Sequence, residues 1–156
     1  MKKFDKIEAP AHYVNNAVEI DGRRFEPVDL AENFDYKLGS AVKYLIRYKD
    51  KGAPVTDLKK AKWYLHRILI RNSVVCGVQC VDASGHVEDR RPRLAALINA
   101  FGKKNKFVRS LFSGVGSIEA ETMISRVSIL DTIELINEEI RNISELRTKR
   151  GGRRGQ

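Results

Sequence analysis

Residues 38–51 read LGSAVKYLIRYKDK, and residues 57–69 read DLKKAKWYLHRIL. In both stretches apolar side chains recur every three or four residues, which is the spacing of one face of a helix. We expect one helix that is capped by Ser40 and ends near Lys51, where Gly52 closes it. The second stretch predicts another helix of similar character, so two neighbouring helices determine the expected fold.

Capping and turn residues set the ends of the elements around these helices. The second helix is expected to begin after a cap at Thr56 or Asp57. Upstream, Asp21-Gly22 lies between two short β-type stretches and supplies the positive φ of a two-residue hairpin turn. Pro27 suits the first position of a helix, which we expect over residues 28–34.

The second half of the chain predicts another small hairpin and more helices. Residues 74–81 and 86–89 are separated by the turn-forming letters DASG, which favours a hairpin or a long ordered loop. Residues 92–101 are expected to form a helix that ends at Gly102, and residues 107–112 form a short apolar segment. The expected fold class is α+β, mainly α.

One long helix is expected from Ile118 to about Thr148, because neither Gly nor Pro interrupts this stretch. Five isoleucines recur in it at steps of four and three residues, the spacing of a coiled-coil seam about two heptads long. They are Ile129, Ile133, Ile136, Ile140 and Ile143. Such a seam packs either on its own domain or on a second chain, and we expect a homo-oligomer through residues 126–147.

The composition excludes several classes of protein. At 156 residues with 42% hydrophobic residues, the chain can bury a core without disulfides. No apolar run approaches the roughly 20 residues of a membrane span, so we expect no membrane partner and a cytoplasmic location.

The net charge is +9, and residues 147–156 hold five Lys or Arg and no acid. That tail is expected to be disordered, either as a polyanion-binding segment or as a solubility tail.

Cationic and aromatic residues share faces of the two central helices. Lys43, Arg47 and Lys51 lie four residues apart, and Lys60 and Tyr64 share a face of the next helix with Arg67 and Arg71. Tyr44 and Trp63 are interleaved with these cations. Cations of this kind clamp phosphate and aromatic rings stack on a base, so the pattern indicates a nucleotide site. The alternative is a pair of solvated helix faces.

Two acids and one histidine are further candidates. Glu26 and Asp29 lie around Pro27, where carboxylates can hold Mg²⁺ together with substrate phosphates. They are equally consistent with helix N-terminal acids that the helix dipole favours. His12, beside Tyr13, is a candidate general base or hydrogen-bonding group.

Familiar nucleotide and metal motifs are absent from the sequence. No G-x-x-x-x-G-K-[ST] occurs, which excludes a Walker-type site. Cys76, Cys80 and His86 lack the spacing of a zinc site, so buried thiols are expected.

Five blocks carry a family resemblance. In order they are AHY (11–13), FEPVD (25–29), LGSAVKYLIR (38–47), KG (51–52) and DLKKAKWYL (57–65). Over about residues 9–70 the chain resembles a bacteriophage family of unknown function that includes a phage nucleotide kinase without a P-loop. The sequence departs from that family's pattern at Ser40, where Asn is usual, and by an insertion at residues 15–20. Residues 71–156 have no counterpart in it.

The resemblance implies a nucleotide site at matching positions. These are His12, Tyr13, Glu26, Asp29, Lys43, Tyr44, Arg47, Lys51, Asp57, Lys60, Trp63 and Tyr64. The function it implies is a Mg²⁺-dependent (deoxy)nucleoside monophosphate kinase with ATP as phosphate donor, acting in the cytoplasm of an infected host cell. In that reading Lys43, Arg47 and Lys51 neutralise phosphates, and truncation of Arg47 weakens nucleotide binding while leaving the fold intact.

Two other functions remain open, and four segments are expected. One alternative is a non-catalytic phage effector that sequesters a host nucleotide signal or inhibits a host protein. The other is a nucleic-acid-binding accessory protein, which the basic tail favours.

The expected segments are a kinase-like domain (1–72), a hairpin and helix connector (73–117), a long helix (118–148) and a basic tail (149–156).

Overall fold

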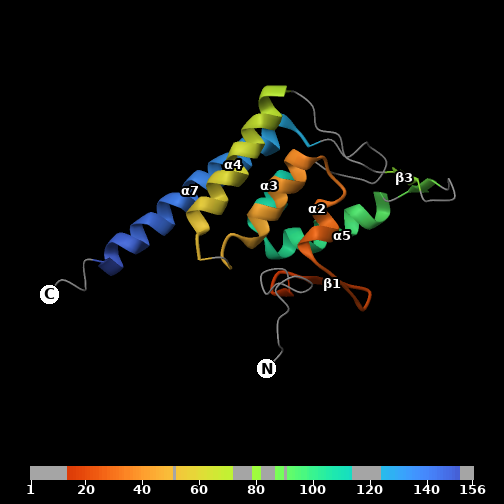
Figure 1. The fold of residues 1–156 in the computed structure, drawn as a ribbon, viewed down its shortest axis with the longest axis horizontal. Helices are drawn as coiled ribbons and strands as arrows, with labels where there is room; N and C mark the ends of the chain where they lie inside the picture. Colours follow the sequence, from red (N-terminus) through yellow and green to blue (C-terminus); the bar gives the residue numbers. More distant parts are fainter. Residues whose placement is uncertain are drawn as a thin grey trace.

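The computed structural model describes residues 14–50, 52–71, 79–81, 87–89, 91–113 and 124–151. It is mainly helical, with two separate two-stranded antiparallel hairpins, which confirms the expected α+β class (Figure 1). The helices gather into one body, and one hydrophobic core runs through it from Val18 to Ile136. Among the described helices none is long and apolar enough to cross a membrane.

The N-terminal hairpin has the predicted turn. Strand β1 (Val18–Ile20) pairs with β2 (Arg23–Phe25), and Ile20 lies opposite Arg23. Between them the backbone takes positive φ at both Asp21 (49°) and Gly22 (72°). These angles are required of a two-residue turn that follows the right-handed twist of its strands, and Asp-Gly supplies them at low steric cost.

Helix α2 (Pro27–Ala31) begins at the expected proline but ends earlier than predicted. Its last carbonyls are satisfied by the side chain of Asn33, which donates to the carbonyls of Asp29 and Leu30. This local bond competes with further helical turns. The chain then passes the buried ring of Phe34 before the next helix.

Helix α3 (Tyr36–Arg47) begins four residues before the predicted cap. Its N-cap is Asp35, whose carboxylate accepts a hydrogen bond from the backbone of Leu38 at 2.8 Å. The expected cap, Ser40, is instead buried inside the helix. The glycine that precedes it allows a close approach to α2 and does not mark a helix end.

Helix α4 (Pro54–Arg71) also begins before its predicted caps. Pro54 occupies the first turn, where its fixed φ fits and its missing N–H costs no hydrogen bond. Asp57 therefore lies within the first turn, and its carboxylate is buried against α3. Figure 1 shows α3 and α4 side by side.

The second half contains the predicted second hairpin and two helices. Strand β3 (Gln79–Val81) pairs antiparallel with β4 (Val87–Asp89). Helix α5 (Arg91–Lys104) continues through Gly102, the position at which a break was predicted. Helix α6 (Lys106–Leu111) covers the expected apolar segment. Asn105 caps α6, since its Oδ1 accepts from the backbones of the second and third residues that follow it.

Helix α7 (Arg126–Gly151) begins later than the predicted Ile118. Ser125 precedes it in non-helical conformation and accepts a hydrogen bond from the backbone of Ser128 at 2.9 Å. Of the predicted seam, the first three isoleucines are buried in the core of this same chain, and the last two are half-buried. They pack with α4 and α6, so most of the seam is covered within one chain.

The C-terminal part of α7 extends beyond the other helices (Figure 1). Residues 141–149 are almost all exposed, and Leu146 is an exposed apolar residue within them. The homo-oligomer through residues 126–147 stays a prediction, and within that range a single chain leaves Val127, Leu130 and Leu146 exposed. Residues 114–123 and the tail after residue 151 lie outside the described residues.

Gly39 provides a test of the contact between α2 and α3. A Cβ at this position would lie 2.6 Å from the backbone oxygen of Ala31. The close atom belongs to the backbone and not to a flexible side chain, so a rotation of a side chain cannot remove the clash. We expect Gly39→Ala to lower the free energy of unfolding by about 1–3 kcal/mol, because overpacking outweighs the gain in helix propensity. Chemical denaturation measures this change.

The matched control is Gly102→Ala in α5. Its Cβ would meet atoms of Arg109 at 3.5 Å or more, which is ordinary contact distance. This substitution should be neutral or stabilising by up to about 1 kcal/mol. Equal effects at the two glycines would contradict the close approach of α3 to Ala31.

Candidate functional site

Nine of the twelve predicted site residues lie in the described part of the chain, and one of the nine, Asp57, lies in the first turn of α4. Six of them come together where α3 and α4 run side by side. They are Lys43, Tyr44, Arg47, Lys60, Trp63 and Tyr64, which together with Tyr36 we call the aromatic–cationic face. Glu26 and Asp29 belong to the start of α2. The remaining three, His12, Tyr13 and Lys51, lie outside the described residues.

Three cations surround the ring of Tyr44. The guanidinium carbon of Arg47 lies 4.5 Å from the ring centroid, and the ammonium nitrogens of Lys60 and Lys43 lie 5.4 and 5.5 Å from it. Lys43 and Arg47 come from α3 and Lys60 comes from α4, so cations of both helices lie close to the ring. The electron-rich face of the ring offsets part of the repulsion among these cations.

The tyrosine ring is also part of an aromatic group. Tyr44 stacks with Tyr64 at a centroid distance of 6.2 Å and an interplanar angle of 16°. Trp63 and Tyr36 approach Tyr64 edge-on, at 5.0 and 5.9 Å. Trp63 is 56% exposed and Tyr36 is 78% exposed, so large aromatic surfaces face solvent beside the cations. Arg67 places its guanidinium 5.5 Å from the Trp63 ring.

Tyr36 is the member of this group that the sequence did not indicate. It lies two helical turns before Tyr44, a spacing that places both on one face of a helix. The signal was hidden because the helix was predicted to begin at Ser40. The hydroxyl oxygens of Tyr36 and Tyr64 lie 3.3 Å apart. This hydrogen bond and partial burial raise the pKa of Tyr64.

Arg47 also pairs with an acid of the neighbouring helix. Its Nε lies 3.2 Å from Oδ2 of Asp57 in α4, and the two side chains are only 11% and 7% exposed. The guanidinium is therefore held between a carboxylate and an aromatic ring. Arg47 therefore joins the two helices. Lys43 and Lys60 are the two lysines whose ammonium groups lie near the Tyr44 ring.

The two predicted metal ligands act as a helix cap. Oδ2 of Asp29 accepts a hydrogen bond from the backbone N–H of Glu26 at 2.6 Å, in a capping-box arrangement around Pro27. This is the alternative that the sequence left open. Within the described ranges no three His, Cys, Asp or Glu side chains form a metal-binding group. One oxygen of the Asp29 carboxylate is engaged by the backbone, and the binding of Mg²⁺ by Glu26 and Asp29 stays a prediction.

One comparison with known proteins finds a match. Residues 7–66 match a family described as a protein of unknown function (DUF3310). This part of the chain is therefore similar to an uncharacterised domain family, and the matched region spans β1, β2, α2, α3 and most of α4. The aromatic–cationic face therefore lies within the matched region. No curated protein and no solved structure matches the chain.

The ion pair between α3 and α4 gives a stability prediction. Arg47→Ala leaves the Asp57 carboxylate buried without its partner, so we expect the free energy of unfolding to fall by about 3–5 kcal/mol. This geometry does not support the expectation that truncation of Arg47 leaves the fold intact. Urea denaturation of the variant measures the loss.

A control variant shows whether the loss of stability comes from the broken ion pair or from the removal of a positive charge in general. Lys43→Ala removes one cation a helical turn earlier, where the side chain is half-buried, and should cost less than about 1 kcal/mol. In Arg47→Ala/Asp57→Ala the two changes should be strongly non-additive. Additive losses would show that Arg47 and Asp57 do not stabilise each other.

Proposed function

We propose that the chain binds a nucleotide on the aromatic–cationic face. The observation that carries this proposal is the group of three cations around Tyr44 next to the exposed ring of Trp63. A nucleotide has a planar base and an anionic phosphate, and this face offers a matching group for each. Its place within the matched family region supports a shared role of these residues.

The exposed aromatic rings are suited to the base. Tyr44 has cations close to its ring, and Tyr64 is packed between Tyr44 and the edges of its neighbours. Trp63 and Tyr36 are both more than half exposed, and Trp63, which has the Arg67 guanidinium 5.5 Å from its ring, offers the larger ring for a base to stack on. Stacking of a base on an aromatic side chain contributes about 1–3 kcal/mol and discriminates little among bases.

The lysines are suited to the phosphate. Lys43 and Lys60 come from different helices and place their ammonium groups near the same tyrosine ring. A phosphate between them would receive charge-assisted hydrogen bonds from two sides. Arg47 contributes its positive charge nearby and positions Tyr44, while its pairing with Asp57 keeps it in place.

Phosphoryl transfer is the more specific form of this proposal, and it rests on the resemblance to the phage family. In that form the chain is a (deoxy)nucleoside monophosphate kinase that uses ATP. Neutralisation of phosphate charge is the part of the reaction that Lys43 and Lys60 can supply, since phosphoryl transfer depends on positioning and charge stabilisation. We assign no step to Mg²⁺, whose binding by Glu26 and Asp29 stays a prediction.

Two variants test the nucleotide site directly. Lys60→Gln should weaken binding of a nucleoside monophosphate by about 1.5–3 kcal/mol, the value of a charge-assisted hydrogen bond. Trp63→Ala should weaken it by about 1–3 kcal/mol through the loss of stacking. Titration calorimetry with several nucleoside mono-, di- and triphosphates measures both changes.

Lys103→Gln is the control, because Lys103 is an exposed lysine near the end of α5 and does not belong to the aromatic–cationic face. It should leave the affinity unchanged. A wild-type affinity in folded Lys60→Gln and Trp63→Ala would rule out this face as the nucleotide site.

The same preparation distinguishes the alternative functions. ATP consumption that depends on a nucleoside monophosphate and on Mg²⁺ indicates a kinase. Tight nucleotide binding without turnover indicates a sequestering protein. Binding to single-stranded oligonucleotides that weakens steeply with salt, and on removal of residues 147–156, indicates a nucleic-acid-binding protein.

A further inference from the structure

A second cation-rich site lies at the C-terminal end of α3. It is a cavity of about 400 Å³ between the end of α3, the junction of α5 with α6, and α7. Four of its lining side chains are cations, Lys49, Lys104, Lys106 and Arg109. Its two acids are Asp50 and Glu139. None of the four cations was singled out by the sequence, because Lys49 and Glu139 are far in the chain from the segment 104–109 that supplies the other three cations.

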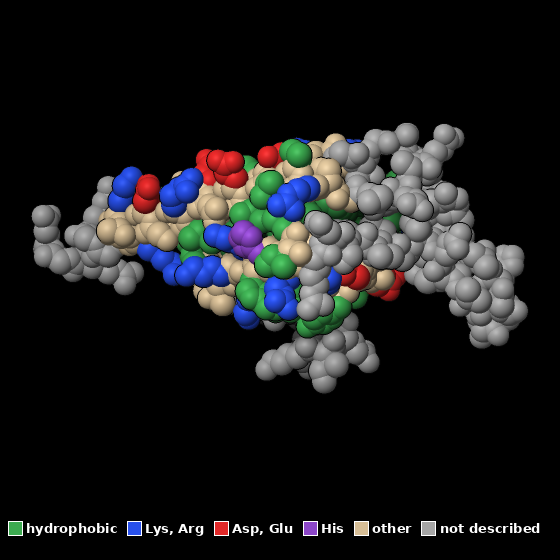
Figure 2. Space-filling view, turned by 90° about the horizontal axis from the view of Figure 1, so that it is seen from above, with side chains coloured by type: hydrophobic (Ala, Val, Ile, Leu, Met, Phe, Trp, Pro, Cys, Tyr) green, Lys and Arg blue, Asp and Glu red, His purple; other side chains and the backbone are tan. Residues whose placement is uncertain are grey.

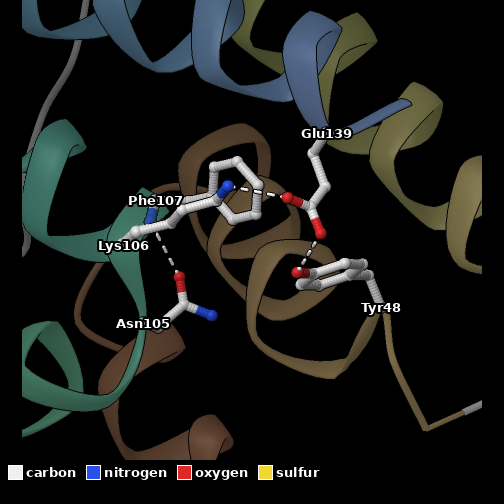
Figure 3. Close-up of polar contacts among 5 residues, drawn as sticks. All are labelled: Tyr48, Asn105, Lys106, Phe107 and Glu139. Carbon is white, nitrogen blue, oxygen red and sulfur yellow. Dashed lines mark hydrogen bonds and ion pairs between the residues drawn. The ribbon is translucent and has the colours of Figure 1, made fainter. Parts of the chain in front are cut away.

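Glu139 is held at the wall of this cavity by two hydrogen bonds (Figure 3). The hydroxyl of Tyr48 donates to its Oε1 at 2.9 Å, and Nζ of Lys106 donates to its Oε2 at 2.6 Å. Both carboxylate oxygens are therefore engaged by residues of α3 and α6. Glu139 and Lys106 form an ion pair that balances one of the four cations.

The protonation states of this group are fixed at neutral pH. Burial alone would raise the pKa of Glu139, but the hydrogen bonds from Lys106 and Tyr48 and the charges of Lys106 and Lys49 more than offset it. The pKa of Glu139 is therefore lowered. Burial and the bond to Glu139 raise the pKa of Tyr48. The carboxylate thus stays ionised and the phenol stays protonated.

The remaining charges leave the cavity positive. Lys49, Lys104 and Arg109 carry three positive charges, and Asp50 carries one negative charge and accepts a hydrogen bond from Asn16. Lys104 also donates to a backbone carbonyl of the N-terminal segment. The net charge of the lining is about +2. Buried Ile46 and Phe107 form part of the wall, and such apolar walls strengthen the field inside the cavity.

We propose that this cavity binds a phosphoryl group, either as free phosphate or as part of a small phosphorylated molecule. A phosphate dianion matches the net charge of the lining, and its oxygens can accept from ammonium and guanidinium groups on several sides at once. The volume exceeds that of the anion itself, which leaves room for a small organic substituent. The site uses none of the residues of the aromatic–cationic face, so it is independent of the proposed function.

The proposal is tested by titration calorimetry of the full chain with inorganic phosphate and with pyrophosphate at low ionic strength. Lys49→Gln/Arg109→Gln should weaken phosphate binding at least about tenfold, since it removes two charged donors. The matched control is Lys59→Gln/Arg141→Gln, which removes the same charge from exposed positions elsewhere and should have little effect. Equal weakening in the two double variants would overturn the proposal, because it would reflect overall charge alone.

Glu139→Gln is a variant that should strengthen phosphate binding instead of weakening it. The amide keeps the shape of the side chain and an acceptor for Tyr48, while it removes a negative charge and releases Lys106 from its ion pair. Phosphate should therefore bind more tightly to this variant, by about threefold or more. Weaker binding in a variant with an unchanged melting temperature would contradict the site, as would the absence of saturable binding at millimolar phosphate in the wild type.

Lys60→Gln separates this site from the nucleotide site. It removes a cation that the aromatic–cationic face would use for phosphate and should leave inorganic phosphate binding in the cavity unchanged. A loss of phosphate binding in Lys60→Gln would show that phosphate occupies the aromatic–cationic face and would overturn the second site. Comparison of free phosphate with a phosphorylated small molecule, such as glycerol phosphate, distinguishes the two sources of the phosphoryl group.

Discussion

The buried ion pair between Arg47 and Asp57 is the interaction on which the arrangement of α3 and α4 depends. It joins the C-terminal end of α3 to the first turn of α4 with little exposure of either side chain. The same guanidinium lies against the ring of Tyr44, which stacks in turn on Tyr64. One electrostatic contact therefore sets the positions of the aromatic rings as well as the helices. A buried pair of this kind constrains geometry more surely than it adds stability.

The periodic positions of apolar residues were sufficient to predict most helices, but not where they begin. Ser40 and Asp57 have side chains typical of helix caps, and each lies near a Gly or Pro. In the structure Asp35 and Pro54 begin those helices. Local sequence offered several acceptable starts, and packing of α3 against the end of α2 selected the earlier one. By contrast, Asp21-Gly22 could be placed exactly where it occurs because its turn depends only on its own backbone angles.

In the candidate site, too, contacts within one helix could be predicted from the sequence and contacts between helices could not. Spacing within one helix correctly grouped Lys43 with Arg47, and Lys60 with Tyr64. It contained no information about contacts between helices, so it treated Arg47 as a free cation although Asp57 pairs with it. The cavity beside α3 illustrates the limit more strongly. Glu139 and Lys106 are separated by 33 positions and Glu139 and Tyr48 by 91, and no periodicity connects them.

The positive charge of the described helices is organised in two different ways. Around Tyr44 the cations lie near an aromatic ring and next to exposed rings, so charge and a stacking surface occur together. In the second cavity Glu139 holds one lysine and the other cations remain around a polar space. Both arrangements offer positive charge to an anion, but only the first adds aromatic rings on which a planar group can stack. The two proposed sites therefore differ in shape as well as in charge, a difference that the net charge of the chain alone does not reveal.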